Sequence, residues 1–380
     1  MPARSTAAKG PGARHVDDAT LLERALVEVK KVIVGHDVVI ERLLTCLLSR
    51  GHCLVEGPPG LAKTLAVATL AEVSGGSFVR LQFTPDLVPA DIVGTRIWRA
   101  STESFDVALG PIFANFVLAD EINRAPAKVQ SALLEVMAER QVSVGGVTHR
   151  LPEPFVVMAT QNPIEAEGVY PLPEAQRDRF LMKVNVGYPS HREEITIVER
   201  MGVRPPHADK VLTPAGLIRL QAAADDVFVD PAIIDYAVQL VQATRDPMRA
   251  GLTLLTGQIA YGASPRASLA LVAAARGLAL LRGRTYALPQ DVSDCYLDVC
   301  RHRLVLSYEA LADDVTPDAL LAHVMERVHP PRVVPRQDAP PGRTEVEPHP
   351  QPLEPAQPQV DGEGAEPSRP GRARSTGRTA

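Results

Sequence analysis

The segment Gly57–Thr64 (GPPGLAKT) holds the residues whose types and spacing most clearly predict chemistry. It follows a short apolar run and opens a helical pattern, which is the context that a phosphate-binding loop requires. Backbone N–H groups of such a loop and the positive end of the helix face the phosphates of a nucleotide. Lys63 would reach the β- and γ-phosphates, and the hydroxyl of Thr64 would bind Mg²⁺. Ala62 replaces the glycine of the general pattern, so binding requires that its backbone angles lie in an ordinary region.

Two carboxylates close the next chemical motif, Phe116–Glu121 (FVLADE), which has the composition of a buried strand. Asp120 would hold the Mg²⁺ shell, and Glu121 would orient and activate an attacking water. An Asp-Glu pair at the end of a strand is often only a solvated strand end. Its place one strand beyond Lys63 favours the catalytic interpretation.

A third motif, Phe155–Asn162 (FVVMATQN), brings a polar residue to the tip of another apolar strand. Asn162 could hydrogen-bond the γ-phosphate or the water. Taken alone, an asparagine before Pro163 is equally typical of a turn.

These motifs need a scaffold, and residues 52–188 have the pattern of one. Apolar runs that end in polar or glycine-rich loops alternate with helical patterns at Lys63–Val73 and Ala127–Glu139. The runs are His52–Glu56, Val79–Phe83, Phe116–Ala119 and Phe155–Ala159. Near-continuous apolar strands between helices predict an α/β fold with a parallel sheet covered on both faces. Hairpins are expected at about Thr95–Val107 and around the turn Gly145-Gly146.

The remaining chain divides into helices and tails. Helical patterns begin at Asp17 and after Gly35, and residues 189–328 read as all helix. Helix starts are indicated by a capping box at Ser190–Glu193 and by four cap-proline pairs, Thr213-Pro214, Asp230-Pro231, Ser264-Pro265 and Thr316-Pro317. We expect a disordered tail at 1–16, a nucleotide-binding domain at 17–188, a helical domain at 189–329 and a disordered tail at 330–380. Eleven of the 34 prolines lie in the last 50 residues, which are either a solvated extension or a partner-binding segment.

The amino-acid composition argues against a nucleic-acid-binding function. The net charge is −5 and only 16 residues are aromatic, which disfavours a protein that holds nucleic acid by charge and stacking. The arginines near the C-terminus are a local exception. We find neither a membrane-spanning run nor a secretory signal, and the four cysteines read as core residues. A cytoplasmic protein is expected.

The order of the motifs resembles that of an AAA+ ATPase, and their amino-acid sequences resemble those of the MoxR family in particular. The similar strings span about residues 20–328. They are Val34-Gly35, GPPGLAKT, Gln82–Leu87, Gly110–Phe113, Leu118–Pro126 (LADEINRAP), Ala159–Pro163 (ATQNP) and Leu172–Lys183 (LPEAQRDRFLMK). The resemblance implies an AAA+ P-loop NTPase core with a smaller all-helical lid domain, and ATP and Mg²⁺ as cofactors. Alanine is the usual residue at the position of Ala62 in that family.

The resemblance also implies roles that the residues alone do not reveal. Val34 and Gly35 would lie against the adenine, although they could equally form a turn between two helices. Arg179 would be an arginine finger supplied to the neighbouring subunit, and without the family context it would be a surface ion-pairing residue. Arg266 would be a second sensor in the first turn of a lid helix, where the positive helix end also addresses a phosphate.

Together these inferences give three sets of candidate residues. The catalytic set is Lys63, Asp120, Glu121, Asn162, Arg179 and Arg266. The nucleotide-binding set is Val34, Gly35, Gly57, Pro58, Pro59, Gly60, Leu61, Ala62, Lys63, Thr64 and Leu65. The metal ligands are Thr64 and Asp120.

A finger acting in trans implies a ring, and relatives of this kind are usually hexamers. The implied function is ATP-driven, chaperone-like remodelling or maturation of client protein complexes, including metal or cofactor insertion. A partner with a von Willebrand factor A-type domain is expected. Two alternatives are a nucleic-acid motor subunit and a nucleotide switch that does not hydrolyse ATP.

Overall fold

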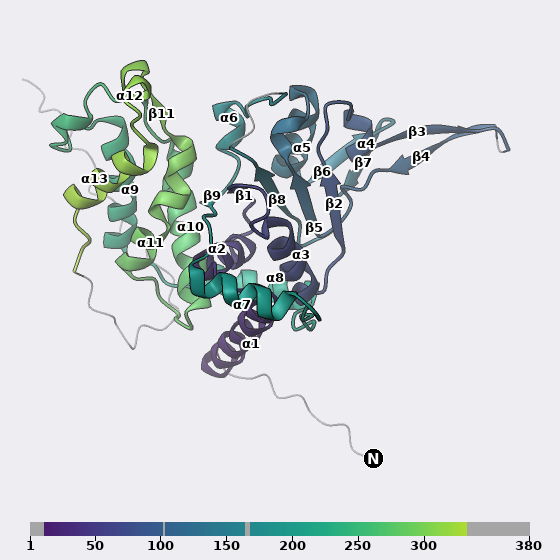
Figure 1. The fold of residues 1–380 in the computed structure, drawn as a ribbon, viewed down its shortest axis with the longest axis horizontal. Helices are drawn as coiled ribbons and strands as arrows, with labels where there is room; N and C mark the ends of the chain where they lie inside the picture. The colour runs from purple at the N-terminus through teal and green to yellow at the C-terminus, as the bar shows by residue number, and fades with distance from the viewer. Residues whose placement is uncertain (1–10, 102, 164–167, 333–380) are drawn as a thin grey trace, which may run out of the picture. The chain divides into compact units, whose positions relative to one another are not determined.

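The computed structural model describes residues 11–101, 103–163 and 168–332 (Figure 1). Its centre is a five-stranded parallel sheet in the order β2-β5-β8-β1-β9. The strands are β1 Cys53–Glu56, β2 Phe78–Gln82, β5 Phe116–Asp120, β8 Val156–Gln161 and β9 Met182–Asn185. The predicted parallel sheet is therefore confirmed, and it includes one strand, β9, that the apolar runs did not reveal.

Helices cover both faces of this sheet, as the near-continuous apolar strands predicted. In β5 the side chain of Leu118 belongs to a core shared with helices α1, α2 and α3, whereas that of Val117 belongs to a core shared with α5. Successive residues of a strand point to opposite faces, so a strand buried on both sides must be apolar throughout. The five residues of β5 are all buried, including its terminal Asp120.

The helices predicted at Lys63 and Ala127 begin at those residues, and only the first helix of the chain begins earlier than expected. The helices of this part are α1 Pro11–Val32, α2 Asp37–Leu48, α3 Lys63–Ser74, α4 Pro89–Val93, α5 Ala127–Glu139 and α6 Glu174–Arg177. Helix α1 starts at Pro11, before the expected boundary at residue 16, because proline lacks the N–H that a first helical turn leaves unpaired. The rest of the expected N-terminal tail, residues 1–10, and residues 333–380 of the C-terminal one lie outside the described residues.

Both predicted hairpins are present. One consists of β3 (Gly94–Arg99) and β4 (Ser104–Leu109), and the other of β6 (Gln141–Val144) and β7 (Val147–Arg150). The β3–β4 hairpin extends away from the sheet in Figure 1. Gly145 and Gly146 both have positive φ at the β6–β7 turn, the conformation that a two-residue turn of this kind requires.

After β9 the chain is helical, with a short two-stranded sheet as an addition. The helices are α7 His191–Met201, α8 Pro214–Asp225, α9 Pro231–Arg245, α10 Pro265–Leu281, α11 Pro289–Cys300, α12 Tyr308–Ala312 and α13 Pro317–Arg327. The added sheet pairs β10 (Ile259–Tyr261) with β11 (Val305–Leu306). All four cap-proline starts are confirmed, and Ser190 forms its capping box with Glu193.

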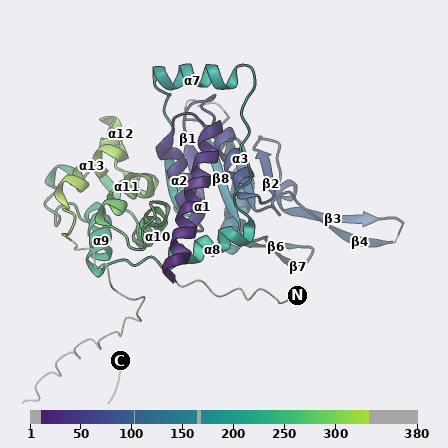
Figure 2. The same cartoon turned by 90° about the horizontal axis from the view of Figure 1, so that it is seen from below.

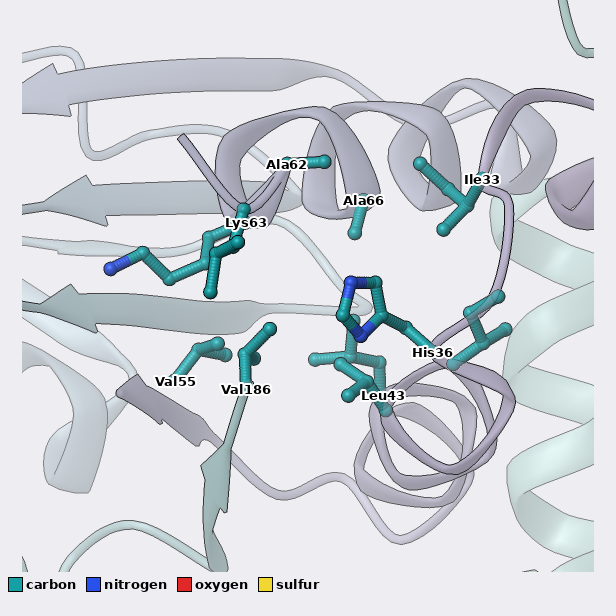
Figure 3. Close-up of a pocket in the computed structure, with 11 residues that line it drawn as sticks. Ile33, His36, Leu43, Val55, Ala62, Lys63, Ala66 and Val186 are labelled. Atoms are coloured by element: carbon teal, nitrogen blue, oxygen red, sulfur yellow. The ribbon is translucent and has the colours of Figure 1, made fainter. Parts of the chain in front are cut away.

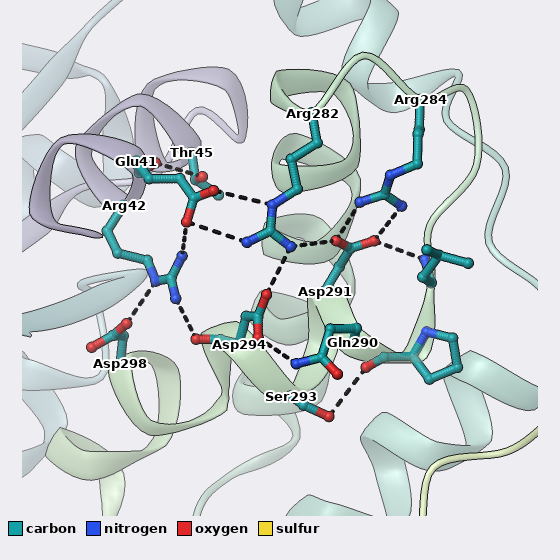
Figure 4. Close-up of polar contacts among 12 residues, drawn as sticks. Glu41, Arg42, Thr45, Arg282, Arg284, Gln290, Asp291, Ser293, Asp294 and Asp298 are labelled. Atoms are coloured by element: carbon teal, nitrogen blue, oxygen red, sulfur yellow. Dashed lines mark hydrogen bonds and ion pairs between the residues drawn. The ribbon is translucent and has the colours of Figure 1, made fainter. Parts of the chain in front are cut away.

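Helix α2 joins the two parts of the fold. Figure 2 shows it, with α1, between helices α9–α13 and helix α3. Its polar side faces α10 and α11 through a network of ion pairs (Figure 4). Arg42 donates to Asp298 at 2.7 Å, and Arg282 bridges Glu41 at 3.1 Å and Asp294 at 2.7 Å. Arg42 and Asp298 are buried, so this contact depends on every charge having its partner.

Two further expectations concern the chain as a whole. The four cysteines are free and buried, as core residues should be. Across the described ranges no helix is long and apolar enough to cross a membrane.

A buried histidine under the sheet makes the stability of this fold depend on pH. The Nδ1 of His52 accepts the N–H of Val157 at 2.9 Å, and its Nε2 lies 3.2 Å from the carbonyl oxygen of Met137. Burial lowers the pKa of His52 to about 4 from its ordinary value of 6.5, because the charged form loses its solvation. Between pH 6.5 and 4, His52 is therefore protonated in the unfolded chain but stays neutral in the native one.

We expect the free energy of unfolding to fall as the pH is lowered from 6.5 to 4, with His52 contributing up to about 3 kcal/mol. Urea unfolding followed by circular dichroism at several pH values measures this. His52→Gln keeps one acceptor and one donor but cannot titrate, so its stability should depend less on pH. His207→Gln, at an exposed position, is the matched control. Equal pH profiles for His52→Gln and wild type would contradict the assignment.

Candidate active site

The loop between β1 and α3 wraps around the start of the helix. Gly60 has φ of 81°, and Ala62 has φ of 53° and ψ of 20°, in the left-handed region. The condition that Ala62 keep ordinary backbone angles is therefore not met. A left-handed residue with a Cβ costs about 1 kcal/mol, so the loop carries a conformation that glycine would adopt more easily. Lys63 then begins α3.

The ammonium group of Lys63 lies across the mouth of this loop. It donates to the carbonyl oxygen of Gly57 and, at 3.1 Å, to that of Gln161 at the end of β8. The lysine thus spans the ends of two adjacent strands.

The carboxylate of Asp120 collects donors from three elements. Its Oδ1 accepts from the hydroxyl of Thr160 at 2.5 Å. Its Oδ2 accepts from Thr64 at 3.3 Å and from two nitrogens of Arg80 at 2.9 and 2.6 Å. The structure thus brings together Thr64 and Asp120, the two predicted metal ligands.

The Thr64–Asp120 pair fits Mg²⁺. Ligand oxygens at about 2.0–2.1 Å in an octahedron lie about 2.9 Å from their neighbours, close to the 3.3 Å between Thr64 Oγ1 and Asp120 Oδ2. No cluster of three or more His, Cys, Asp or Glu side chains suits a metal in the part of the chain that the structure describes. Mg²⁺ does not need one, because it usually binds through one or two carboxylates, waters and substrate phosphates.

Glu121 follows directly and is held by polar neighbours. Its backbone is left-handed, with φ of 56°. Its Oε2 accepts from Gln82 Nε2 at 3.0 Å and pairs with Arg124 Nε at 2.9 Å. Its N–H donates to the hydroxyl of Thr160, which itself donates to Asp120. Thr160 therefore fixes the carboxylate of Asp120 and the backbone of Glu121 relative to β8.

Asn162 lies directly after β8, between the carboxylate strand β5 and the loop strand β1. It is buried, and its carbonyl accepts from Asn123 at 3.5 Å. Because the strands are parallel, the carboxyl ends of β1, β5 and β8 lie side by side, as the sequence predicted.

A cavity beside the loop has a mostly apolar lining (Figure 3). Its wall includes Ile33, His36, Ala62, Lys63 and Ala66, and the remaining lining residues are Val39, Ile40, Leu43, Val55, Leu61 and Val186. Val34 and Gly35, expected against the base, are not among them, whereas their neighbours Ile33 and His36 are. Gly35 instead lies against Glu193 of α7, which an added Cβ would approach to 2.6 Å.

The two predicted arginines are linked through Asp178, the residue before Arg179. Arg179, exposed, donates to the carbonyl oxygen of Leu134 in α5. Arg266 contacts Asp178 at 3.4 Å. Asp178 also accepts from Arg303 at 2.7 Å and from Ser264 at 3.2 Å. Asp178 therefore ties the segment that carries Arg179 to the helix that carries Arg266.

Comparison with known proteins agrees with this geometry. A model of the ATPase family associated with various cellular activities (AAA) matches residues 52–182, and an AAA lid domain model matches residues 251–324. The chain is 61% identical over 318 residues to Chaperone MoxR1 of Mycobacterium tuberculosis, covering 83% of this chain and 84% of that protein. The chain belongs to the MoxR family of AAA+ ATPases.

Other members extend the comparison. The protein YeaC of Bacillus subtilis is 42% identical over 313 residues, covering 82% of this chain and 95% of YeaC. A solved structure from Cytophaga hutchinsonii superposes with a TM-score of 0.80 at 40% identity, covering 84% of this chain and 98% of that one. The MoxR assignment thus rests on sequence, and the solved structure supports the ATPase fold.

Several residues of this MoxR site were not predicted from the sequence. Thr160 lies inside the ATQNP motif, so its position two residues before Asn162 was a usable signal. Arg80 and Gln82 alternate along β2, which places both on one side of that strand. No local pattern indicated that they would face the carboxylates of β5.

The left-handed backbone of Ala62 generates a test of the loop. Ala62→Gly removes a cost of about 1 kcal/mol but adds about 0.4–1 kcal/mol of unfolded-state entropy. We expect an almost unchanged melting temperature and retained nucleotide binding. Ala62→Val puts a β-branched residue in the left-handed region, where it is a steric outlier, and should weaken binding of a fluorescent ATP analogue at least tenfold.

Melting temperatures of both variants control for folding. Wild-type affinity in a folded Ala62→Val protein would show that the bound loop does not use the left-handed conformation.

Proposed function

We propose that this MoxR-family chain hydrolyses ATP to ADP and phosphate with Mg²⁺, and uses the energy to remodel other proteins. The observation that supports this most strongly is the convergence of Lys63, the Thr64–Asp120 pair and Glu121 at one edge of the sheet. Each group has a different task in phosphoryl transfer to water.

The roles follow from the chemistry of each side chain. Lys63 and the loop N–H groups bind the phosphates, and Thr64 and Asp120 hold the metal. Bound Mg²⁺ neutralises charge that develops on the phosphate oxygens. Glu121 is a partly exposed carboxylate that accepts hydrogen bonds, so it can orient a water and take its proton. Asn162 would hydrogen-bond the γ-phosphate or the water from the adjacent strand.

We further propose that the active form is a ring, expected to be a hexamer, with Arg179 supplied to the neighbouring subunit's site. Its exposed position on the segment after α6 suits a group that acts outside its own chain. Arg266 would report the nucleotide state from the lid helix α10, and the two hairpins would face the pore or ring surface.

The remaining functional expectations come from the family. They are a client protein complex, whose maturation could include metal or cofactor insertion, a partner with a von Willebrand factor A-type domain, and action in the cytoplasm. A pull-down with a variant that binds ATP without hydrolysing it is the direct route to the client.

Glu121→Gln is that variant, and it tests the catalytic assignment. The amide cannot take a proton, so turnover should fall by about 10²–10⁴-fold while Mg²⁺-dependent ATP binding persists. Phosphate release and equilibrium binding measure the two properties. Glu72→Gln, on the exposed side of α3, makes the same chemical change away from the site and should leave both unchanged. Normal hydrolysis by Glu121→Gln would sink the assignment.

A mixing experiment tests the trans arrangement of Arg179. Arg179→Ala alone should lose about 10³–10⁵-fold in turnover, because the transition-state charge loses its partner. Mixing it with Glu121→Gln should restore part of the phosphate release, since some interfaces then combine an intact Arg179 with an intact Glu121.

The control mixes Glu121→Gln with the double variant Glu121→Gln/Arg179→Ala, in which no interface has an intact Glu121. Recovery there, or no recovery in the first mixture, would count against a finger supplied in trans.

A further inference from the structure

Arg80 contacts Asp120 at the centre of the site through two nitrogens of its guanidinium, yet neither phosphate binding nor water activation requires it. It projects from β2, which in the described residues is the strand at one edge of the sheet. Its Nε and Nη2 donate to Asp120 Oδ2 at 2.9 and 2.6 Å. The same oxygen accepts the hydroxyl of Thr64, the second predicted metal ligand.

Burial explains why Asp120 needs such a partner. Its side chain is only 9% exposed, and a buried carboxylate without a compensating charge is strongly destabilising. Thr64 and Thr160 donate hydrogen bonds but carry no charge. The guanidinium of Arg80 is permanently positive and supplies the charge that a bound metal ion would otherwise provide.

We propose that Arg80 is a built-in counter-cation, which holds Asp120 in the metal-free site and gives it up when Mg²⁺ binds. The proposal rests on the proposed function, because it assumes a Mg²⁺-nucleotide site at Thr64 and Asp120. Two cations on one carboxylate oxygen repel each other, so Arg80 and the metal compete for Oδ2. Arg80 can move away from Asp120 at little cost in free energy, because 52% of its side chain is already exposed.

The same arginine also connects the two carboxylates. Its Nη2 donates to Gln82 Oε1 at 2.9 Å, and Gln82 Nε2 donates to Glu121 Oε2 at 3.0 Å. When Arg80 leaves Asp120, the amide of Gln82 loses the donor that fixes its orientation. Arg80 thus acts on Glu121 through Gln82 and does not contact it directly, so it is a positioning residue.

The first test measures the pair without any metal or nucleotide. In EDTA, Arg80→Gln should lower the melting temperature by about 2–4 °C, because Asp120 loses its counter-charge. In an Asp120→Asn background the same change should have almost no effect, because no charge remains to be compensated. Equal losses in the two backgrounds would overturn the counter-cation assignment. Saturating Mg²⁺-ATP should remove the difference between Arg80→Gln and wild type.

The second test measures competition with the metal. The Mg²⁺ concentration that half-saturates binding of N-methylanthraniloyl-ATP should fall about three- to tenfold in Arg80→Gln. Losing a competing charge-assisted hydrogen bond changes such a midpoint by about tenfold. Solvent exposure weakens the contact between Arg80 and Asp120, so the expected change is smaller. Arg80→Lys keeps the charge and should lie closer to wild type. Arg99→Gln, which removes an exposed arginine from its pair with Asp106, is the matched control with an unchanged midpoint.

The outcomes separate the two proposals. A wild-type protein that binds the nucleotide with Mg²⁺, and an Arg80→Gln midpoint that is equal or higher, would overturn the role of Arg80 alone. A higher midpoint would mean that Arg80 helps to hold the metal or phosphate. A wild-type protein without Mg²⁺-dependent binding would overturn the proposed function and the role of Arg80 with it.

Discussion

The buried negative charge of Asp120 is the constraint on which the site depends. It ends a strand whose other residues are all apolar and buried, so water cannot solvate it well. Its donors come from α3, β8 and β2 through Thr64, Thr160 and Arg80. Because a poorly solvated carboxylate is costly unless these donors are present, one charge fixes the relative positions of three elements. Of these elements, α3 follows the phosphate-binding loop, β8 ends just before Asn162, and β2 is the edge strand of the sheet in the described residues.

The parts of this structure that the sequence predicts are those decided by neighbouring residues. The strand Phe116–Asp120 is apolar on both faces, and the helix starts at Thr213-Pro214 and Ser264-Pro265 combine a capping side chain with a proline. The loop at Gly57–Thr64 is also local, because its strand, turn and helix are consecutive. Such features need no knowledge of the rest of the fold.

The features that escaped prediction depend on distant partners. Strand β9 (MKVN) is half polar, and only its pairing with β1 makes it a strand. Arg80 looks like any exposed charge until β2 pairs with β5 and brings Asp120 beside it. Tertiary pairing decided each of these outcomes.

Helix α2 offers a physical route between the cavity and the lid. One side of it lines the cavity through Val39, Ile40 and Leu43, and His36 precedes its first turn. Its other side holds α10 and α11 through Glu41 and Arg42 (Figure 4). If the adenine of the proposed ATP binds in this cavity, it must displace His36 or push α2, because packed side chains leave little free space. The Arg42–Asp298 pair is buried and therefore costly to leave unpaired, so α11 would follow a movement of α2.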